Sequence, residues 1–157
     1  MKVCFLLIGK TTEDYLKEGI AIYEKRLKNY LTVEVKVIPE LKKTSGLTFD
    51  QQKVAEGKLI LAQIAPADAV VLLDERGNQH SSEDFSVYLE RYMLRGTKTL
   101  FFVVGGPYGF SEEVYKRAND SLSLSKMTFS HQMVRLIFLE QLYRAMTILN
   151  NEPYHHS

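Results

Sequence analysis

Two stretches of this chain have residue types and spacing that suit chemistry. The first is the glycine-rich run 105–110, GGPYGF, which follows the apolar segment 98–104 and precedes Ser111, a residue type that opens helices. Glycines leave room for a ligand beside the backbone, and the free N–H groups at a helix start face polar or anionic groups. This stretch therefore predicts a binding site for a small ligand.

The second stretch is the C-terminal sequence Tyr154-His155-His156. A tyrosine ring can stack on a nucleobase, and histidine, with an unperturbed pKa of about 6.5, suits proton transfer at neutral pH. The alternative is a solvated and inert terminus. A metal site is not expected, because no cysteine or acidic cluster with ligand spacing accompanies the histidines.

The last predicted helix, 131–150, is apolar around its whole axis. A helix of this kind is buried on all sides, so we expect one side to face the sheet and another to face a second copy of the chain. Arg135 lies among these apolar residues, where a snorkelling or interface arginine and a substrate contact are equal alternatives. Glu140 and Arg144 are four residues apart and are expected to pair.

Apolar segments of strand length alternate with helical periodicity along the whole chain. This order predicts one α/β domain, a parallel sheet covered by helices on both faces in an α/β/α sandwich. Strands are expected at 3–8, 33–37, 69–73, 98–104 and 122–127, and helices at 12–30, 48–64, 82–93, from 111, and at 131–150. A turn is expected at 76–78 and a mobile loop at 40–47.

The predicted ligand site takes its parts from three of these strands. Leu73, Gly105 and the hydroxyl-rich segment 122–129 all lie at the carboxyl end of a strand. Ligands of parallel sheets bind at that edge, so the three segments are expected to converge there.

Composition limits the class of protein. The net charge of +1 over 157 residues excludes a bulk electrostatic nucleic-acid binder but not one that recognises a shaped RNA. The single cysteine, Cys4, lies in an apolar strand and is expected to be a buried filler in a reducing compartment. The apolar run 3–8 is too short for a secretory signal, and no run spans a bilayer, so a cytoplasmic protein is expected.

Several motifs of the chain, in this order and spacing, resemble the RlmH family of SPOUT-class methyltransferases. They are GGPYG at 105–109, LSLSKMTF at 122–129, HQMVR at 131–135, EQLYRA at 140–145 and PYH at 153–155. The resemblance covers essentially the full chain. It implies one SPOUT domain over 1–157, with a C-terminal trefoil knot at roughly 70–157 that binds S-adenosyl-L-methionine, and a homodimer. It also implies methylation of N3 of a pseudouridine in large-subunit (23S) ribosomal RNA on assembled ribosomes.

The resemblance also implies roles for individual residues. The cofactor would be held by Leu73, Gly105, Leu124, Ser125, Lys126, Met127, Thr128 and Phe129. His155 would assist loss of the imide proton, with Tyr154 stacking on or orienting the base. Phosphate or developing negative charge would be held by His131, Arg135, Arg144 and His156.

One position departs from the family pattern. Relatives commonly carry a basic residue directly after the Tyr-His pair, whereas this chain has His156. A phosphate contact at this position would be weaker or dependent on pH, because histidine is only partly charged near neutrality.

Two other functions stay open. One is a non-catalytic module that binds ribosomes or RNA, which cofactor binding without methyl transfer would indicate. The other is a SPOUT enzyme for another nucleoside, such as a tRNA position, which an exchange of substrates would identify.

Overall fold

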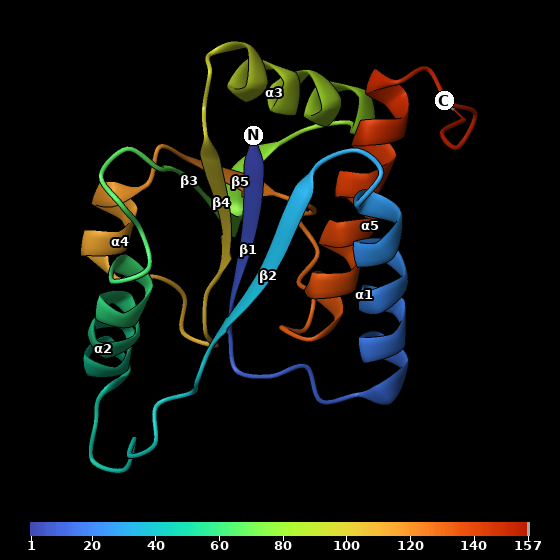
Figure 1. The fold of residues 1–157 in the computed structure, drawn as a ribbon. Helices are drawn as coiled ribbons and strands as arrows, with labels where there is room; N and C mark the ends of the chain where they lie inside the picture. Colours follow the sequence, from blue (N-terminus) through green and yellow to red (C-terminus); the bar gives the residue numbers. More distant parts are fainter. Residues whose placement is uncertain (157) are drawn as a thin grey trace.

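A parallel sheet of five strands forms the centre of the molecule in the computed structural model, which describes residues 1–156 (Figure 1). The strand order is β2-β1-β4-β3-β5, and every neighbouring pair is parallel. The predicted α/β sandwich is therefore confirmed. The strands are β1 (Lys2–Ile8), β2 (Thr32–Ile38), β3 (Ala69–Gln79), β4 (Thr99–Val104) and β5 (Asp120–Ser123).

Helices cover both faces of the sheet. On one face α5 lies between α1 and α3, and on the other α2 packs beside α4 (Figure 1). The bounds are α1 (Asp14–Leu27), α2 (Phe49–Leu61), α3 (Ser82–Leu94), α4 (Glu112–Arg117) and α5 (Met133–Leu149).

The inner strand β1, between β2 and β4, is buried on both faces, as a strand inside a parallel sheet must be. Phe5 and Leu7 point into the core beneath α1, α3 and α5, whereas Leu6 and Ile8 point into the core beneath α2 and α4. Cys4 belongs to the second core, where burial raises the pKa of its thiol to about 11. A buried, protonated thiol fits the filler role predicted for Cys4.

Local sequence signals set most helix starts. Thr48 and Gln51 form a capping box at the start of α2, and Ser111 caps α4. The helix expected from residue 12 begins only at Asp14, and the Thr12 N–H donates instead to the Gln132 side chain at 2.8 Å.

Strand β3 continues through the segment in which a turn was predicted. It pairs with β5 at Leu73↔Leu122 and again at Asn78↔Leu122, so that residues 74–77 bulge out of the ladder. Gly77 makes this possible, because a Cβ atom there would lie 2.7 Å from the Leu122 nitrogen. The glycine therefore serves a close approach of two backbones and not a turn.

The segment after β5 is irregular. The strand ends at Ser123, so the prediction of a strand over 122–127 is wrong for residues 124–127. The Ser123 hydroxyl donates to the Ser125 carbonyl at 2.9 Å, and the Ser125 hydroxyl accepts from the Met127 N–H at 2.9 Å. These local bonds satisfy the backbone without a neighbouring strand.

The chain itself covers a large part of the apolar surface of α5. Phe138, Leu142 and Ala145 are fully buried, because α1 and α3 flank the helix. Other apolar side chains of α5, among them Leu136, Ile137 and Tyr143, are only partly buried. The second copy expected from the sequence therefore stays a prediction. None of the helices within residues 1–156 has the length and apolar character needed to cross a membrane.

We predict that Gly77→Ala destabilises the fold by about 2 kcal/mol or more. The added Cβ would clash with backbone atoms of Ser121 and Leu122, which cannot move away as a flexible side chain can. Urea unfolding followed by circular dichroism measures this. The exposed neighbour Gln79→Ala serves as the control, with an expected change within about 0.5 kcal/mol. Equal stability of the two variants would contradict the prediction.

Candidate functional site

A cavity of about 440 Å³ opens at the carboxyl ends of β3 and β4. Its walls are the bulge of β3, the glycine-rich loop 105–110, the segment after β5, and the start of α5 at Val134. The three segments that were expected to converge at this edge of the sheet do so.

Seven of the eight residues predicted to hold the cofactor line this cavity. They are Leu73, Gly105, Leu124, Ser125, Met127, Thr128 and Phe129. Lys126 is exposed and is not among the lining residues. The structure thus places the seven together, and their role toward a cofactor stays a prediction.

The glycine-rich loop is a tight turn. The Gly109 N–H donates to the Gly106 carbonyl at 3.2 Å, and Gly109 has a φ of 85°, which favours glycine. Behind the turn, Gly106 lies directly against the carboxylate of Glu56, leaving no space for a side chain at 106. Burial and the nearby Glu40 raise the pKa of Glu56, although a hydrogen bond with the Gly106 backbone opposes this.

The rim of the cavity contains polar residues that sequence reasoning missed. The Tyr115 hydroxyl donates to Asp74 and accepts from the Arg76 guanidinium at 3.0 Å. Burial and the Asp74 carboxylate raise the pKa of Tyr115. Nothing in the sequence pairs these residues, because Tyr115 lies on α4 and the other two lie in the bulge of β3.

One hydrogen bond joins two walls of the cavity. The Thr128 hydroxyl donates to the Glu75 carboxylate at 3.0 Å, although the two residues are 53 positions apart in the chain. The bulge of β3 and the segment after β5 are therefore held side by side at the cavity mouth.

Arg135 does not reach the cavity. It is only 1% exposed, and its guanidinium donates to the Ile8 carbonyl at 2.9 Å and to the carbonyls of Gly9 and His131 at 3.0 Å. Burial lowers the pKa of Arg135. Within this chain Arg135 is a buried arginine whose hydrogen bonds go to backbone carbonyls, and its predicted contact with a substrate stays a prediction. His131 itself does line the cavity.

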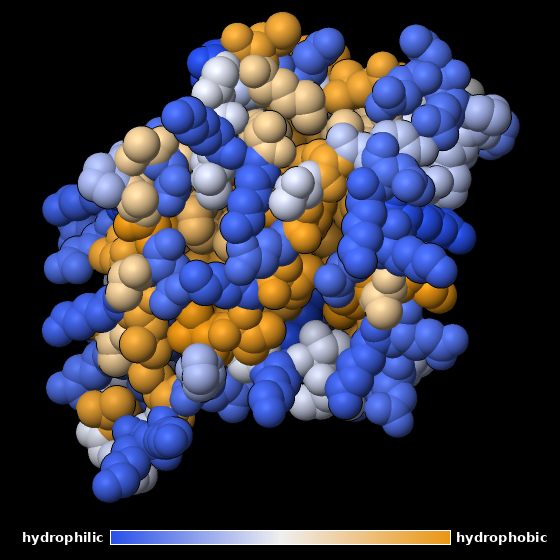
Figure 2. Space-filling model, viewed as in Figure 1, coloured by the Kyte–Doolittle hydropathy of each residue, from blue (hydrophilic) through white to orange (hydrophobic). Residues whose placement is uncertain are grey.

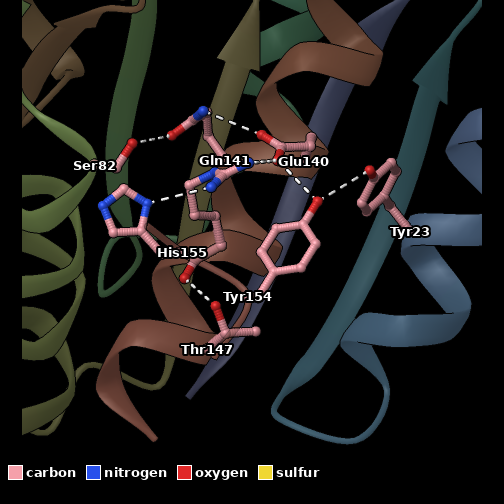
Figure 3. A network of polar contacts seen from close by, with 8 residues as sticks. Tyr23, Ser82, Glu140, Gln141, Thr147, Tyr154 and His155 are labelled. Carbon is pink, nitrogen blue, oxygen red and sulfur yellow. Dashed lines mark hydrogen bonds and ion pairs between the residues drawn. The ribbon is translucent and has the colours of Figure 1, made fainter. Parts of the chain in front are cut away.

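The C-terminal tail folds back along α5 (Figure 3). The Tyr154 hydroxyl donates to Glu140 at 3.0 Å and lies 3.3 Å from the Tyr23 hydroxyl, while the Arg144 guanidinium lies 4.7 Å from the centre of the Tyr154 ring. Burial and these two hydroxyl contacts raise the pKa of Tyr154. Glu140 and Arg144 pair at 2.5 Å as predicted.

Both ring nitrogens of His155 have partners. Nδ1 lies 3.2 Å from Arg144 Nη1, and Nε2 lies 2.8 Å from Glu83 Oε1. Because arginine only donates, Nδ1 accepts, and the ring proton of a neutral imidazole is then on Nε2, toward Glu83. This hydrogen bond lowers the pKa of Glu83. In this position His155 has no free lone pair for a substrate.

The tail and the cavity lie at different parts of α5. Only the first turn of the helix lines the cavity. The tail follows the opposite end of the helix and packs against Glu140 and Arg144 (Figure 1). None of the described tail residues lines the cavity, and His156 is exposed. The predicted cofactor residues and the predicted catalytic pair are thus not brought together within one chain. Among residues 1–156, no group of three or more histidine, cysteine, aspartate or glutamate side chains could hold a metal ion.

Comparison with known proteins gives relatives that match over the full length. Ribosomal RNA large subunit methyltransferase H of Christiangramia forsetii is 60% identical over 156 residues, and that of Parabacteroides distasonis is 58% identical. The protein of the same name from Bacteroides thetaiotaomicron is 54% identical. Each match covers 99% of this chain and 99% of the relative.

Among solved structures, the SpoU methyltransferase AviRb of Streptomyces viridochromogenes matches with a TM-score of 0.45 and 11% identity, over 96% of this chain and 61% of that one. A family model described as a predicted SPOUT methyltransferase matches residues 1–155. This match and the relatives of 54% to 60% identity show that the chain belongs to the SPOUT methyltransferase family.

Proposed function

We propose that the chain transfers the methyl group of S-adenosyl-L-methionine to N3 of a pseudouridine in large-subunit (23S) ribosomal RNA, and that it does so on assembled ribosomes in the cytoplasm. The full-length relatives named ribosomal RNA large subunit methyltransferase H support the substrate class. The observation that carries the proposal is the cavity in which seven predicted cofactor residues meet.

The cavity fits a cofactor of this size and chemistry. Its volume of about 440 Å³ lies in the range of small-molecule sites, and its walls combine apolar side chains with open backbone. Val104, Leu124 and Phe129 offer apolar surface, while Ser125 and the glycine-rich loop offer polar groups. When bound, S-adenosyl-L-methionine supplies a methyl group that is activated by its sulfonium charge.

The work left to the protein is alignment and proton removal. The imide nitrogen of pseudouridine is a poor nucleophile until it loses its proton, so a positioned base accelerates the step. We assign this role to His155, with Tyr154 orienting the base. His131 lies at the cavity, where it can contact the substrate, and Arg144 and His156 are the basic groups near the tail.

For His155 to accept a proton, one ring nitrogen must be released. In the free chain Nδ1 accepts from Arg144 and Nε2 donates to Glu83. We therefore propose that the observed tail is a resting position, and that binding of the substrate replaces the contact of Nδ1 with Arg144, which frees the lone pair of that nitrogen.

We propose that the active unit is a homodimer in which the tail of one chain completes the cavity of the other. The support is the separation of tail and cavity along α5 within one chain. The proposal includes one SPOUT domain over residues 1–157 with a trefoil knot at roughly 70–157. Glu75 and Thr128 both lie within this region, and the hydrogen bond between them is compatible with a chain that crosses itself in a knot.

Methyl transfer to ribosomes tests the proposal directly. We expect label from radioactive S-adenosyl-L-methionine in the large-subunit rRNA of assembled ribosomes that lack the modification, and little in free rRNA or tRNA. Label in tRNA would indicate another nucleoside. No label in any acceptor, from protein that binds the cofactor, would indicate a non-catalytic module.

His155→Ala should lower kcat about a hundredfold or more, because it removes the proposed base. His156→Ala should leave kcat within a few fold and raise KM for ribosomes. Steady-state kinetics of both variants give the comparison. The reverse pattern would make His156 the proton acceptor.

Mixed dimers test which chain supplies the tail. We expect the homodimers of His155→Ala and of Gly105→Leu, a change that crowds the cavity, to be almost inactive. A heterodimer of these two variants should regain up to about half of the wild-type activity. One of its two sites then combines an intact cavity with an intact tail. An inactive heterodimer would mean that each tail serves its own cavity.

A further inference from the structure

Two exposed aromatic rings stack on each other at the mouth of the cavity. Tyr108 lines the cavity from the glycine-rich loop, and Phe49 is the first residue of α2. Their ring centroids are 4.1 Å apart with an interplanar angle of 18°. Phe49 is 63% exposed and Tyr108 is 40% exposed.

The fold does not use this pair for its core. Neither ring belongs to the two clusters of buried apolar side chains that lie on either side of the sheet. Single exposed apolar side chains are common, but a stacked pair beside a binding cavity is a feature of interaction sites.

The backbone presents both rings in fixed positions. Tyr108 follows Pro107 in the turn closed by the hydrogen bond from Gly109 to Gly106. Phe49 directly follows Thr48, whose capping box with Gln51 fixes the first turn of α2. A pair held in this way loses little conformational freedom when it binds a partner.

The loop that leads into α2 carries positive charge. Its exposed residues Lys42 and Lys43 follow Leu41, which shares a hollow with Val54 of α2. The charge of Lys53 on α2 is paired with Asp50 at 3.2 Å. Figure 2 shows hydrophilic and hydrophobic side chains side by side at the lower left, over the start of α2 and this loop. Exposed rings suit the bases of a nucleic-acid strand, and lysines on the adjoining loop suit its negative phosphates.

We infer that the Phe49–Tyr108 pair stacks on the base of an unpaired rRNA nucleotide next to the one that enters the cavity. The inference rests on the proposed function. A target base must leave its stack to reach an enzyme cavity, which also deprives its neighbours of a stacking partner. Aromatic side chains replace that partner without regard to base identity.

Kinetics of Phe49 variants test the inference without touching a cavity residue. Phe49→Leu keeps an apolar side chain but removes the ring, and it should raise KM for ribosomes about tenfold while kcat and cofactor affinity stay within about twofold. Phe49→Trp should restore KM. Leu94→Ala is the matched control, because this side chain on α3 is 80% exposed. It should leave KM for ribosomes, kcat and cofactor affinity unchanged.

Equal KM values for wild type and Phe49→Leu would overturn the inference. So would a loss of cofactor affinity with KM for ribosomes unchanged, which would make the pair part of the cofactor site.

Fluorescence gives a second readout that does not need turnover. The chain has no tryptophan, so Phe49→Trp introduces a single tryptophan, whose fluorescence can be excited apart from that of the nine tyrosines. A short single-stranded oligoribonucleotide should quench it, and the same sequence in a duplex should not. Absence of quenching would overturn the inference. Quenching in a protein that methylates no acceptor would keep the inference and reject the proposed function.

Discussion

The close approach of β3 and β5 at Gly77 is the constraint on which the site depends. Because the two strands resume pairing after the bulge, residues 74–77 must leave the ladder, and three of them form the wall of the cavity. The bulge also brings Glu75 within reach of Thr128 and places Asp74 against Tyr115. A side chain at position 77 would separate the backbones and disturb each of these contacts.

Helix α5 distributes the functional groups between two places. Its first turn borders the cavity, and Arg135 binds it to the carbonyls of Ile8, the last residue of β1, and of Gly9. Its later turns hold the tail, where Glu140 and Arg144 engage Tyr154 and His155. The helix therefore keeps cavity and tail apart within a chain, because a helix does not kink sharply without a break in its hydrogen bonds. Completion of the site by a second chain is the proposal that this separation supports.

Several errors of the sequence analysis share one cause. The turn expected at 76–78 came from Gly77, but the glycine serves a contact with β5, more than 40 residues away. The helix expected from residue 12 begins at Asp14, and the Thr12 N–H donates instead to the side chain of Gln132. The partners of Arg135 were likewise visible only in the fold, because the carbonyls of Ile8 and Gly9 are distant from it in sequence. Each error concerns a partner that is distant in sequence.

The sequence by itself determined the order of strands and helices along the chain, the caps of α2 and α4, and the edge of the sheet at which the cavity opens. These follow from periodicity, capping residues and the direction of parallel strands, which are local or general properties. Only the tertiary structure decided that Asp74, Arg76 and Tyr115 meet at the cavity, that Lys126 is not among the lining residues, and that both nitrogens of His155 are engaged. Such contacts depend on the register of strands and the packing of helices, which no local pattern encodes.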